Sequence, residues 1–466
     1  MSSILNGFRI VVGQFELVMG IITLIGLLLQ RKKAGDVIKG VVKAIVGVMI
    51  LKQGSTILQA AYRPAMNILQ KAFNITGVIT ENYAGMAAIN SNLAESILSV
   101  IPQVMVLGFL INLLLARFSP LKYIFLSGHT MLAFATLIAW IMKWFFNVEG
   151  VFLTLSAALF CGIYWTVMPA WVHKYAREFV GNDFSLGHIS GTSAIISSLT
   201  GKAIGGYRKN GGKIFNEEEE NVKFKGISSI FNDSTVVTCL LMTVVLSGIC
   251  LLAGKDYIVE AAGNTNWVVF TLELGASFTV GIVILLSGVR MMIAELVPAF
   301  KGISDKLIPN AIPSLDMPIF FPLAPISAVL GFIGAFIGEF LGFGVLLAVG
   351  SPILMIPGII ATFFDGGIAG VFGFKFGGKK AAFISGIIVG VVQILGGVFF
   401  TKWAGLSTIG ATYGNTDFGS IWVALSGIMS IVRNIWVFLA ILIGILIVSI
   451  LVLKPKQMQN AKQLAS

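Results

Sequence analysis

The chain has 466 residues, of which 56% are hydrophobic and only 11% are charged. Soluble domains typically have about 45–50% apolar and about 25% charged residues, so a water-soluble enzyme or binding module of this size is excluded. The formal net charge of +11 does not indicate nucleic-acid binding, because the cationic residues gather in loops between apolar runs. The composition therefore predicts an all-α polytopic membrane protein.

Apolar runs of helical length follow one another along the whole chain. A helix that crosses about 30 Å of hydrocarbon needs about 20 mostly apolar residues. Eleven runs approach or reach this length, although the second is short and contains Lys39 and Lys43. The sequence therefore predicts about 11 transmembrane helices, at residues 14–30, 37–51, 97–116, 123–145, 149–170, 234–253, 266–289, 318–337, 343–363, 381–400 and 434–453.

Basic loops predict how these helices are oriented. Cytoplasmic loops carry an excess of Lys and Arg, so Arg31, Lys32 and Lys33 place the first loop inside the cell. Alternation from that loop places five further segments inside, and all are basic. Eleven crossings then put the N-terminus outside and the tail 454–466 in the cytoplasm. The segments placed inside are 117–122, 171–233, 290–306, 375–380 and 454–456.

Four stretches have the composition neither of a transmembrane helix nor of a polar loop: 74–96, 181–206, 308–327 and 364–378. Irregular backbone at membrane depth survives only where it lines a cavity or is buried in protein. The glycine-rich stretches 181–206 and 364–378 follow the fifth and the ninth crossing, so we expect two re-entrant hairpins and an inverted-repeat transporter architecture. Alternatively, their glycines only allow close helix packing. Asn182, Asp183 and Asp365 favour the hairpins.

Two of the three histidines follow glycine in membrane-associated stretches. His129 stands in Leu-Ser-Gly-His-Thr and His188 in Ser-Leu-Gly-His. Ionisable residues at membrane depth generally face a cavity and serve a function, although a histidine bonded to a backbone carbonyl is the structural alternative. His173 borders a basic loop, and we expect it to be solvated.

Asp316 is the acidic residue most indicative of a binding site. Pro313 and Pro318 flank it, and prolines free backbone groups beside a carboxylate that can accept hydrogen bonds from a hydroxylated ligand. Its alternative role is to cap the helix that follows.

Motifs of soluble enzymes and ATP-driven pumps are absent from the sequence. It contains no GxxxxGK[ST], HExxH or GxSxG pattern and no paired CxxC, so we expect neither a cofactor nor a metal centre. Cys161, Cys239 and Cys250 lie in or beside apolar runs and are predicted to be buried rather than reactive.

Several motifs together resemble the ascorbate-type membrane permease, the IIC component of the bacterial phosphotransferase system. The longest is Gly-Val-Arg-Met-Met-Ile-Ala-Glu-Leu-Val-Pro-Ala-Phe-Lys-Gly-Ile-Ser at residues 288–304, followed by Leu-Ile-Pro-Asn-Ala at 307–311 and then by Asp316. The others are Val-Ile-Thr-Glu-Asn-Tyr-Ala at 78–84, Leu-Ser-Gly-His at 126–129, Phe-Ser-Leu-Gly-His at 184–188 and Phe-Lys-Phe-Gly-Gly at 374–378. The resemblance extends from Gly13 to about Leu453.

The resemblance implies a homodimer in the bacterial cytoplasmic membrane. Residues 1–466 would form one IIC unit, in which a core transport domain and a dimerisation domain are interleaved. The subunit itself would be non-catalytic, because separate cytoplasmic IIB and IIA subunits carry the phosphoryl group. L-ascorbate is the implied substrate, with another sugar acid, a pentose or a polyol as alternatives. A proton- or sodium-coupled secondary transporter of a small sugar or sugar acid is the competing hypothesis.

The resemblance also implies the substrate contacts. In the ascorbate permeases, glutamines stand at the positions of Ala133 and Ile189, so two amide partners are missing in this sequence. The implied contact residues are Asn82, Tyr83, His129, Thr130, Met131, Leu132, Ala133, His188, Ile189 and Asp316.

Overall fold

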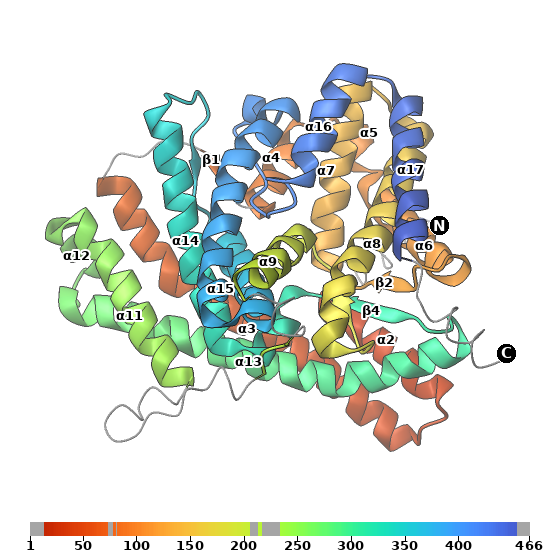
Figure 1. Ribbon diagram of the computed structural model, residues 1–466, viewed down its shortest axis with the longest axis horizontal. Helices are drawn as coiled ribbons and strands as arrows, with labels where there is room; N and C mark the ends of the chain where they lie inside the picture. The colour runs from red at the N-terminus through yellow and green to blue at the C-terminus, as the bar shows by residue number, and fades with distance from the viewer. Residues whose placement is uncertain (1–13, 73–77, 81, 206–212, 217–233, 454–466) are drawn as a thin grey trace.

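A computed structural model of the chain describes residues 14–72, 78–80, 82–205, 213–216 and 234–453, and most of them are helical (Figure 1). The predicted tail 454–466 lies outside the described residues. The helices are α2 (Phe15–Leu29), α3 (Ala34–Ala72), α4 (Asn82–Asn92), α5 (Glu95–Leu98), α6 (Ile101–Phe118), α7 (Gly128–Phe146), α8 (Gly150–Val180), α9 (Gly191–Ile204), α11 (Ser234–Ala253), α12 (Lys255–Ala262), α13 (Trp267–Lys306), α14 (Pro325–Ala348), α15 (Ile359–Trp403), α16 (Ile421–Val432) and α17 (Ile435–Leu453), with the 3₁₀ helices η2 (Met317–Leu323) and η3 (Leu406–Ile409).

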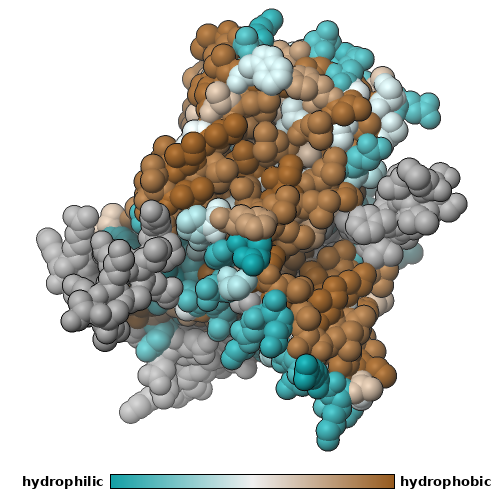
Figure 2. Space-filling model, turned by 90° about the vertical axis from the view of Figure 1, so that its right-hand side faces the viewer, coloured by the Kyte–Doolittle hydropathy of each residue, from teal (hydrophilic) through white to brown (hydrophobic). Residues whose placement is uncertain are grey.

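The helical membrane class predicted from composition is confirmed. Among the described residues, seven helices are long and apolar enough to cross a membrane, or eight if the bent pair formed by α11 and α12 counts as one span. Many large apolar side chains on these helices are exposed, such as Val151 on α8 and Leu451 on α17. Figure 2 shows one side of the molecule on which hydrophobic residues cover most of the described surface, as expected for a face in contact with lipid.

The two long helices α3 and α13 pack along each other, and α13 runs across the base of the molecule in Figure 1. Their backbones come close because glycines lie at the contact: a Cβ on Gly288 would stand 2.3 Å from the Leu51 nitrogen. The second predicted helix, 37–51, is much shorter than α3. Hydropathy falls after Leu51, but Gln, Ala and Leu in the following residues are good helix formers, so the helix continues.

Two predicted crossings, 318–337 and 343–363, are wrong in their bounds. Prolines explain why the observed bounds differ from the predicted ones. The 3₁₀ helix η2 occupies the proline-rich start of the first range, and α14 begins only at Pro325. The second range is not one helix, because α14 ends at Ala348 and a non-helical stretch with Pro352, Pro357 and the short strand β5 (Met355–Ile356) precedes α15.

Helix α15 folds back on itself at Gly378. The side chains of Asp365 and Gln393, one on each arm, are hydrogen-bonded at 3.2 Å, so the two arms lie side by side. Gly378 has φ 73° and ψ −174°, a region that essentially only glycine adopts. The stretch 364–378, expected to form a whole hairpin, is therefore one arm of a larger helical hairpin. Of the stretch 181–206, the structure describes residues 181–205, which form a turn, the strand Ser185–Leu186 and the helix α9. The insertion of either into the membrane stays a prediction.

Short parallel strands join distant parts of the chain. The strands β2 (Tyr123–Phe125), β4 (Ile312–Leu315) and β3 (Ser185–Leu186) form one sheet in the order β2-β4-β3. In its register, Phe125 and Ser185 both pair with Ser314. The strand β1 (Val78–Ile79) pairs with β5. Because all three strands of the first sheet are parallel, their carboxyl ends meet at one edge.

Candidate substrate site

Three polar side chains converge where the strands of this sheet end. His129 lies four residues after β2, His188 two residues after β3, and Asp316 directly after β4. The parallel register therefore explains why residues from three distant segments meet. Ligand sites of parallel sheets commonly lie outside the carboxyl ends of the strands.

The distances within this trio are short. His129 Nε2 lies 3.5 Å from Asp316 Oδ2, and His188 Nε2 lies 3.8 Å from Asp316 Oδ1. The ligand atoms of all three residues lie within 4.8 Å of one another. The His129 side chain is 33% exposed, whereas those of His188 and Asp316 are 7% and 10% exposed. The trio is thus a nearly buried polar cluster with its more open side at His129, and it is close enough together to act on one small ligand.

Asp316 also caps the short helix η2. Its Oδ1 accepts a hydrogen bond from the Met317 backbone N–H at 2.8 Å. The capping role considered from the sequence is therefore confirmed, and it fixes the carboxylate beside the histidines. The cap does not exhaust the hydrogen-bonding capacity of Asp316, because an ionised carboxylate offers about four acceptor positions.

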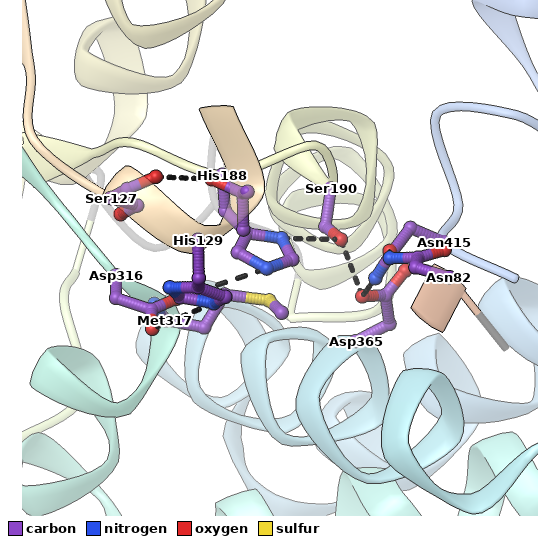
Figure 3. A network of polar contacts seen from close by, with 10 residues as sticks. Asn82, Ser127, His129, His188, Ser190, Asp316, Met317, Asp365 and Asn415 are labelled. Carbon is purple, nitrogen blue, oxygen red and sulfur yellow. Dashed lines mark hydrogen bonds and ion pairs between the residues drawn. The ribbon is translucent and has the colours of Figure 1, made fainter. Parts of the chain in front are cut away.

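His188 is held from behind by a second buried network (Figure 3). Its Nδ1 lies 3.0 Å from Ser190 Oγ, which in turn donates to Asp365 Oδ1 at 2.5 Å. Asp365, on the first arm of α15, accepts further hydrogen bonds from Asn415 Nδ2 at 2.7 Å, from the Thr416 N–H and hydroxyl, and from Gln393 Nε2. Asp365 therefore joins α9, both arms of α15 and the segment that follows η3.

That last segment, Thr412-Tyr-Gly-Asn-Thr-Asp at 412–417, was missed by the sequence analysis. All six residues are buried. The Tyr413 hydroxyl donates to the Ala133 carbonyl at 3.2 Å, and Asp417 accepts from the Thr192 N–H at 2.7 Å. Hydropathy offered no signal here, but six small or polar residues between two apolar helices could have been noticed, as irregular backbone in a membrane protein must find internal partners.

Asn82 reaches the same segment. Its amide nitrogen donates to Asn415 Oδ1, and its oxygen accepts from the Gly414 N–H at 3.1 Å. The structure therefore places Asn82 beside the network behind His188 rather than against the trio. The side chain of Tyr83, the next residue in α4, lies outside the described part of the chain.

The remaining predicted contact residues surround His129 and His188 in the sequence. The Thr130 hydroxyl donates a hydrogen bond to the Ser127 carbonyl at 2.8 Å. Ala133 and Ile189, which stand where the ascorbate permeases have glutamines, are 3% and 0% exposed. Met131 is buried and Leu132 half-buried within the apolar core.

The prediction that His173 is solvated is wrong. It is 3% exposed, its ring lies 5.3 Å from that of Tyr123, and its Nε2 lies 3.3 Å from Asn182 Oδ1. The basic residues beside it are on the outer face of α8, while His173 points inward. Sequence neighbours alone could not reveal this, because adjacent positions of a helix face different directions.

Long apolar helices around a nearly buried, polar and partly open cluster are typical of a membrane transport protein. The comparisons give the family. The model of the PTS system sugar-specific permease component, EIIC-GAT, matches residues 10–420, and the chain therefore belongs to this family. It is also similar to a protein of Mycoplasma pneumoniae named the ascorbate-specific PTS system EIIC component, with 28% identity over 434 residues. The match covers 82% of this chain but only 64% of that relative.

Proposed function

We propose that this protein is the IIC permease that carries L-ascorbate, or a closely related sugar acid, across the bacterial cytoplasmic membrane for phosphorylation by a separate IIB subunit. The observation that supports this most directly is the convergence of His129, His188 and Asp316 at one sheet edge. Ascorbate enters the proposal through the Mycoplasma relative's name and through the motifs described above.

The chemistry of the trio suits a hydroxylated ligand. Imidazole nitrogens can donate to or accept from hydroxyl groups, and a carboxylate accepts from them. In this proposal Asp316 accepts the hydroxyl group that is to be phosphorylated and orients it when the site faces the cytoplasm.

The surrounding helices favour an anionic ligand over a neutral polyol. Helix α7 begins at Gly128, the residue before His129, and α9 begins at Gly191, three residues after His188. Helix N-termini carry a partial positive charge, and interrupted helices of transporters commonly point this end at anionic substrate groups. This arrangement supports a sugar acid such as ascorbate.

The transport cycle would follow the pattern implied by the family. The trio, α9 and the α15 hairpin would belong to a core domain that moves as a rigid body, and α3 with α13 would belong to the dimerisation domain of a homodimer. Eleven crossings, two re-entrant hairpins, an outside N-terminus and a cytoplasmic C-terminus complete this proposal. Close glycine contacts between α14 and both arms of α15 would keep the moving body rigid.

One observation favours the competing hypothesis of ion coupling. Glu339 on α14 and Asp365 on α15 are both fully buried, and carboxylates inside a membrane protein often serve proton or sodium relays. A permease of the phosphotransferase system needs its IIB partner, whereas an ion-coupled carrier needs a gradient. The two hypotheses therefore differ in one measurable requirement.

Uptake in a bacterial strain without its own ascorbate permease tests the proposal. We expect the chain to restore uptake of labelled L-ascorbate only when matching IIA and IIB proteins are co-expressed, and the label should accumulate as the phosphate ester. Accumulation of unmodified ascorbate that collapses with an uncoupler would contradict the proposal and favour ion coupling.

A further inference from the structure

We propose that Asp365, acting through Ser190, fixes His188 in the tautomer that carries its proton on Nδ1, so that Nε2 faces the candidate site as an acceptor for a ligand hydroxyl. Asp365 and Ser190 are then positioning residues, because neither belongs to the trio at the strand ends. The role in ligand binding rests on the proposed function, but the tautomer can be tested without it.

Asp365 determines which group donates in each hydrogen bond of this relay. Its neighbours are donors: the Thr416 backbone N–H can only donate, and the amide nitrogens of Asn415 and Gln393 also donate. The Asp365 carboxylate thus acts as an acceptor throughout. Ser190 Oγ, 2.5 Å from Asp365 Oδ1, must therefore point its single hydrogen at this carboxylate.

The hydrogen-bonding capacity of the Ser190 hydroxyl determines how it bonds to His188. A serine hydroxyl has one hydrogen and two lone pairs. Once Ser190 has donated to Asp365, it can only accept from His188 Nδ1 at 3.0 Å. A neutral His188 then carries its proton on Nδ1 and leaves Nε2 with a lone pair, since the hydrogen bond of one ring nitrogen sets the state of the other.

The other ring nitrogen of His188, Nε2, faces the Asp316 carboxylate, which is also an acceptor. His188 Nε2 lies 3.8 Å from Asp316 Oδ1, which is too long for a direct hydrogen bond. A ligand group that donates hydrogen bonds can therefore bind to His188 Nε2, to Asp316 Oδ1 or to both. Hydroxyl groups of a sugar or sugar acid are such donors, whereas a ligand that offers only acceptors would be rejected. The buried network thus selects for hydroxyl donors at this end of the site.

Nitrogen NMR on the full-length protein in detergent tests the tautomer directly. The chain has only three histidines, so ¹⁵N-histidine labelling gives three rings, which single substitutions can assign. We expect the His188 ring of the wild-type protein, without ligand and above the pH at which it is protonated, to show a protonated Nδ1 and an unprotonated Nε2. The opposite tautomer would overturn the proposal.

Two variants test the path to Asp365. Ser190→Ala removes the acceptor and should convert His188 to a mixture of tautomers, or to the Nε2–H form. Ser193→Ala is the matched control, because the Ser193 hydroxyl donates to the Asp365 backbone carbonyl at 2.8 Å rather than to its carboxylate. Asp365→Asn, which presents an amide to a cluster of donors, should disturb the same His188 resonances. Unchanged His188 resonances in Ser190→Ala or in a folded Asp365→Asn protein would overturn the relay.

Binding of L-ascorbate to the same proteins separates the two proposals. Ser190→Ala should weaken binding about threefold to tenfold, as expected for a hydrogen bond that is no longer oriented, and Ser193→Ala should leave it unchanged. If the wild type binds no ascorbate but shows the expected tautomer, the proposed function fails and the relay stands. If the wild type binds ascorbate and Ser190→Ala binds it equally well, the role of the relay in binding is refuted.

Discussion

His188 and Asp316 face each other across 3.8 Å although they come from different halves of the chain. The pairing of β3 with β4 brings them together, since Leu186 stands opposite Leu315 at the ends of the two strands. The residues that follow each strand then reach the site. His129 joins them through β2 on the other side of β4. The candidate site is therefore built by a small sheet within a helical membrane protein.

Replacement of Asp316 tests the centre of the site. Asp316→Asn should reduce affinity for L-ascorbate by about tenfold or more, because hydrogen bonds to a charged group contribute about 1.5–3 kcal/mol. Uptake should be abolished and the protein should remain folded. Glu295→Gln serves as a control, since Glu295 pairs with the exposed Lys43 at 3.2 Å on another helix. Normal uptake by Asp316→Asn would remove this residue from the mechanism.

The three histidines should separate into two classes. His129→Ala and His188→Ala should both weaken ascorbate binding, and His129→Ala should largely keep thermal stability because the His129 side chain is 33% exposed. His173→Ala should lower thermal stability without weakening binding, because His173 is buried against Tyr123 away from the trio. Isothermal calorimetry and thermal melting of the same preparations measure both effects. Equal loss of binding in all three variants would indicate general damage rather than a site.

Asn82 is expected to act through the 412–417 segment. Asn82→Ala leaves the Gly414 N–H and the Asn415 side chain without this partner, which should cost about 1–3 kcal/mol of stability. Asn92→Ala is the matched control on the same helix, because its side chain is exposed and donates to the Ala88 carbonyl within α4. Equal melting temperatures for the two variants would contradict the anchoring role.

How far the sequence alone led to this picture depended on the kind of signal. Apolar runs predicted the helical membrane class, and glycine-histidine steps with a proline-flanked aspartate pointed to the three residues that meet. The bounds near residues 318–363 failed because hydropathy does not register that Pro325 starts a helix while Pro352 and Pro357 interrupt one. The sequence analysis missed the 412–417 segment because several of its polar groups bond to residues far away in sequence, such as Asp365.

The fold of α15 depends on Gly378. Its φ of 73° with ψ near 180° is accessible essentially only to glycine, so Gly378→Ala should destabilise the protein by about 1–3 kcal/mol. Gly344→Ala is the matched control: it lies within helix α14 and a Cβ there meets nothing within 4 Å. Alanine is the better helix former, so that variant should be equally or slightly more stable. Melting curves in detergent compare the two, and an unaffected Gly378→Ala would contradict the sharp reversal.

Chelation distinguishes direct ligand binding from a metal-dependent site. The ligand atoms of His129, His188 and Asp316 are grouped closely enough to hold a cation, and imidazole with carboxylate is a common ligand set for zinc. In the proposed function these groups contact the substrate themselves, so EDTA should leave ascorbate binding unchanged. Loss of binding on EDTA treatment and its recovery with added Zn²⁺ would instead make this cluster a metal site.

Ligand-induced stabilisation of the purified protein tests the central claim most directly. A ligand at 100 times its dissociation constant should raise the free energy of unfolding by about 2.7 kcal/mol. We predict that L-ascorbate raises the melting temperature of the wild type more than pentoses or hexitols do, and that Asp316→Asn largely loses this shift. Stabilisation by another sugar but not by ascorbate would contradict the substrate assignment, and an equal shift in Asp316→Asn would contradict the site.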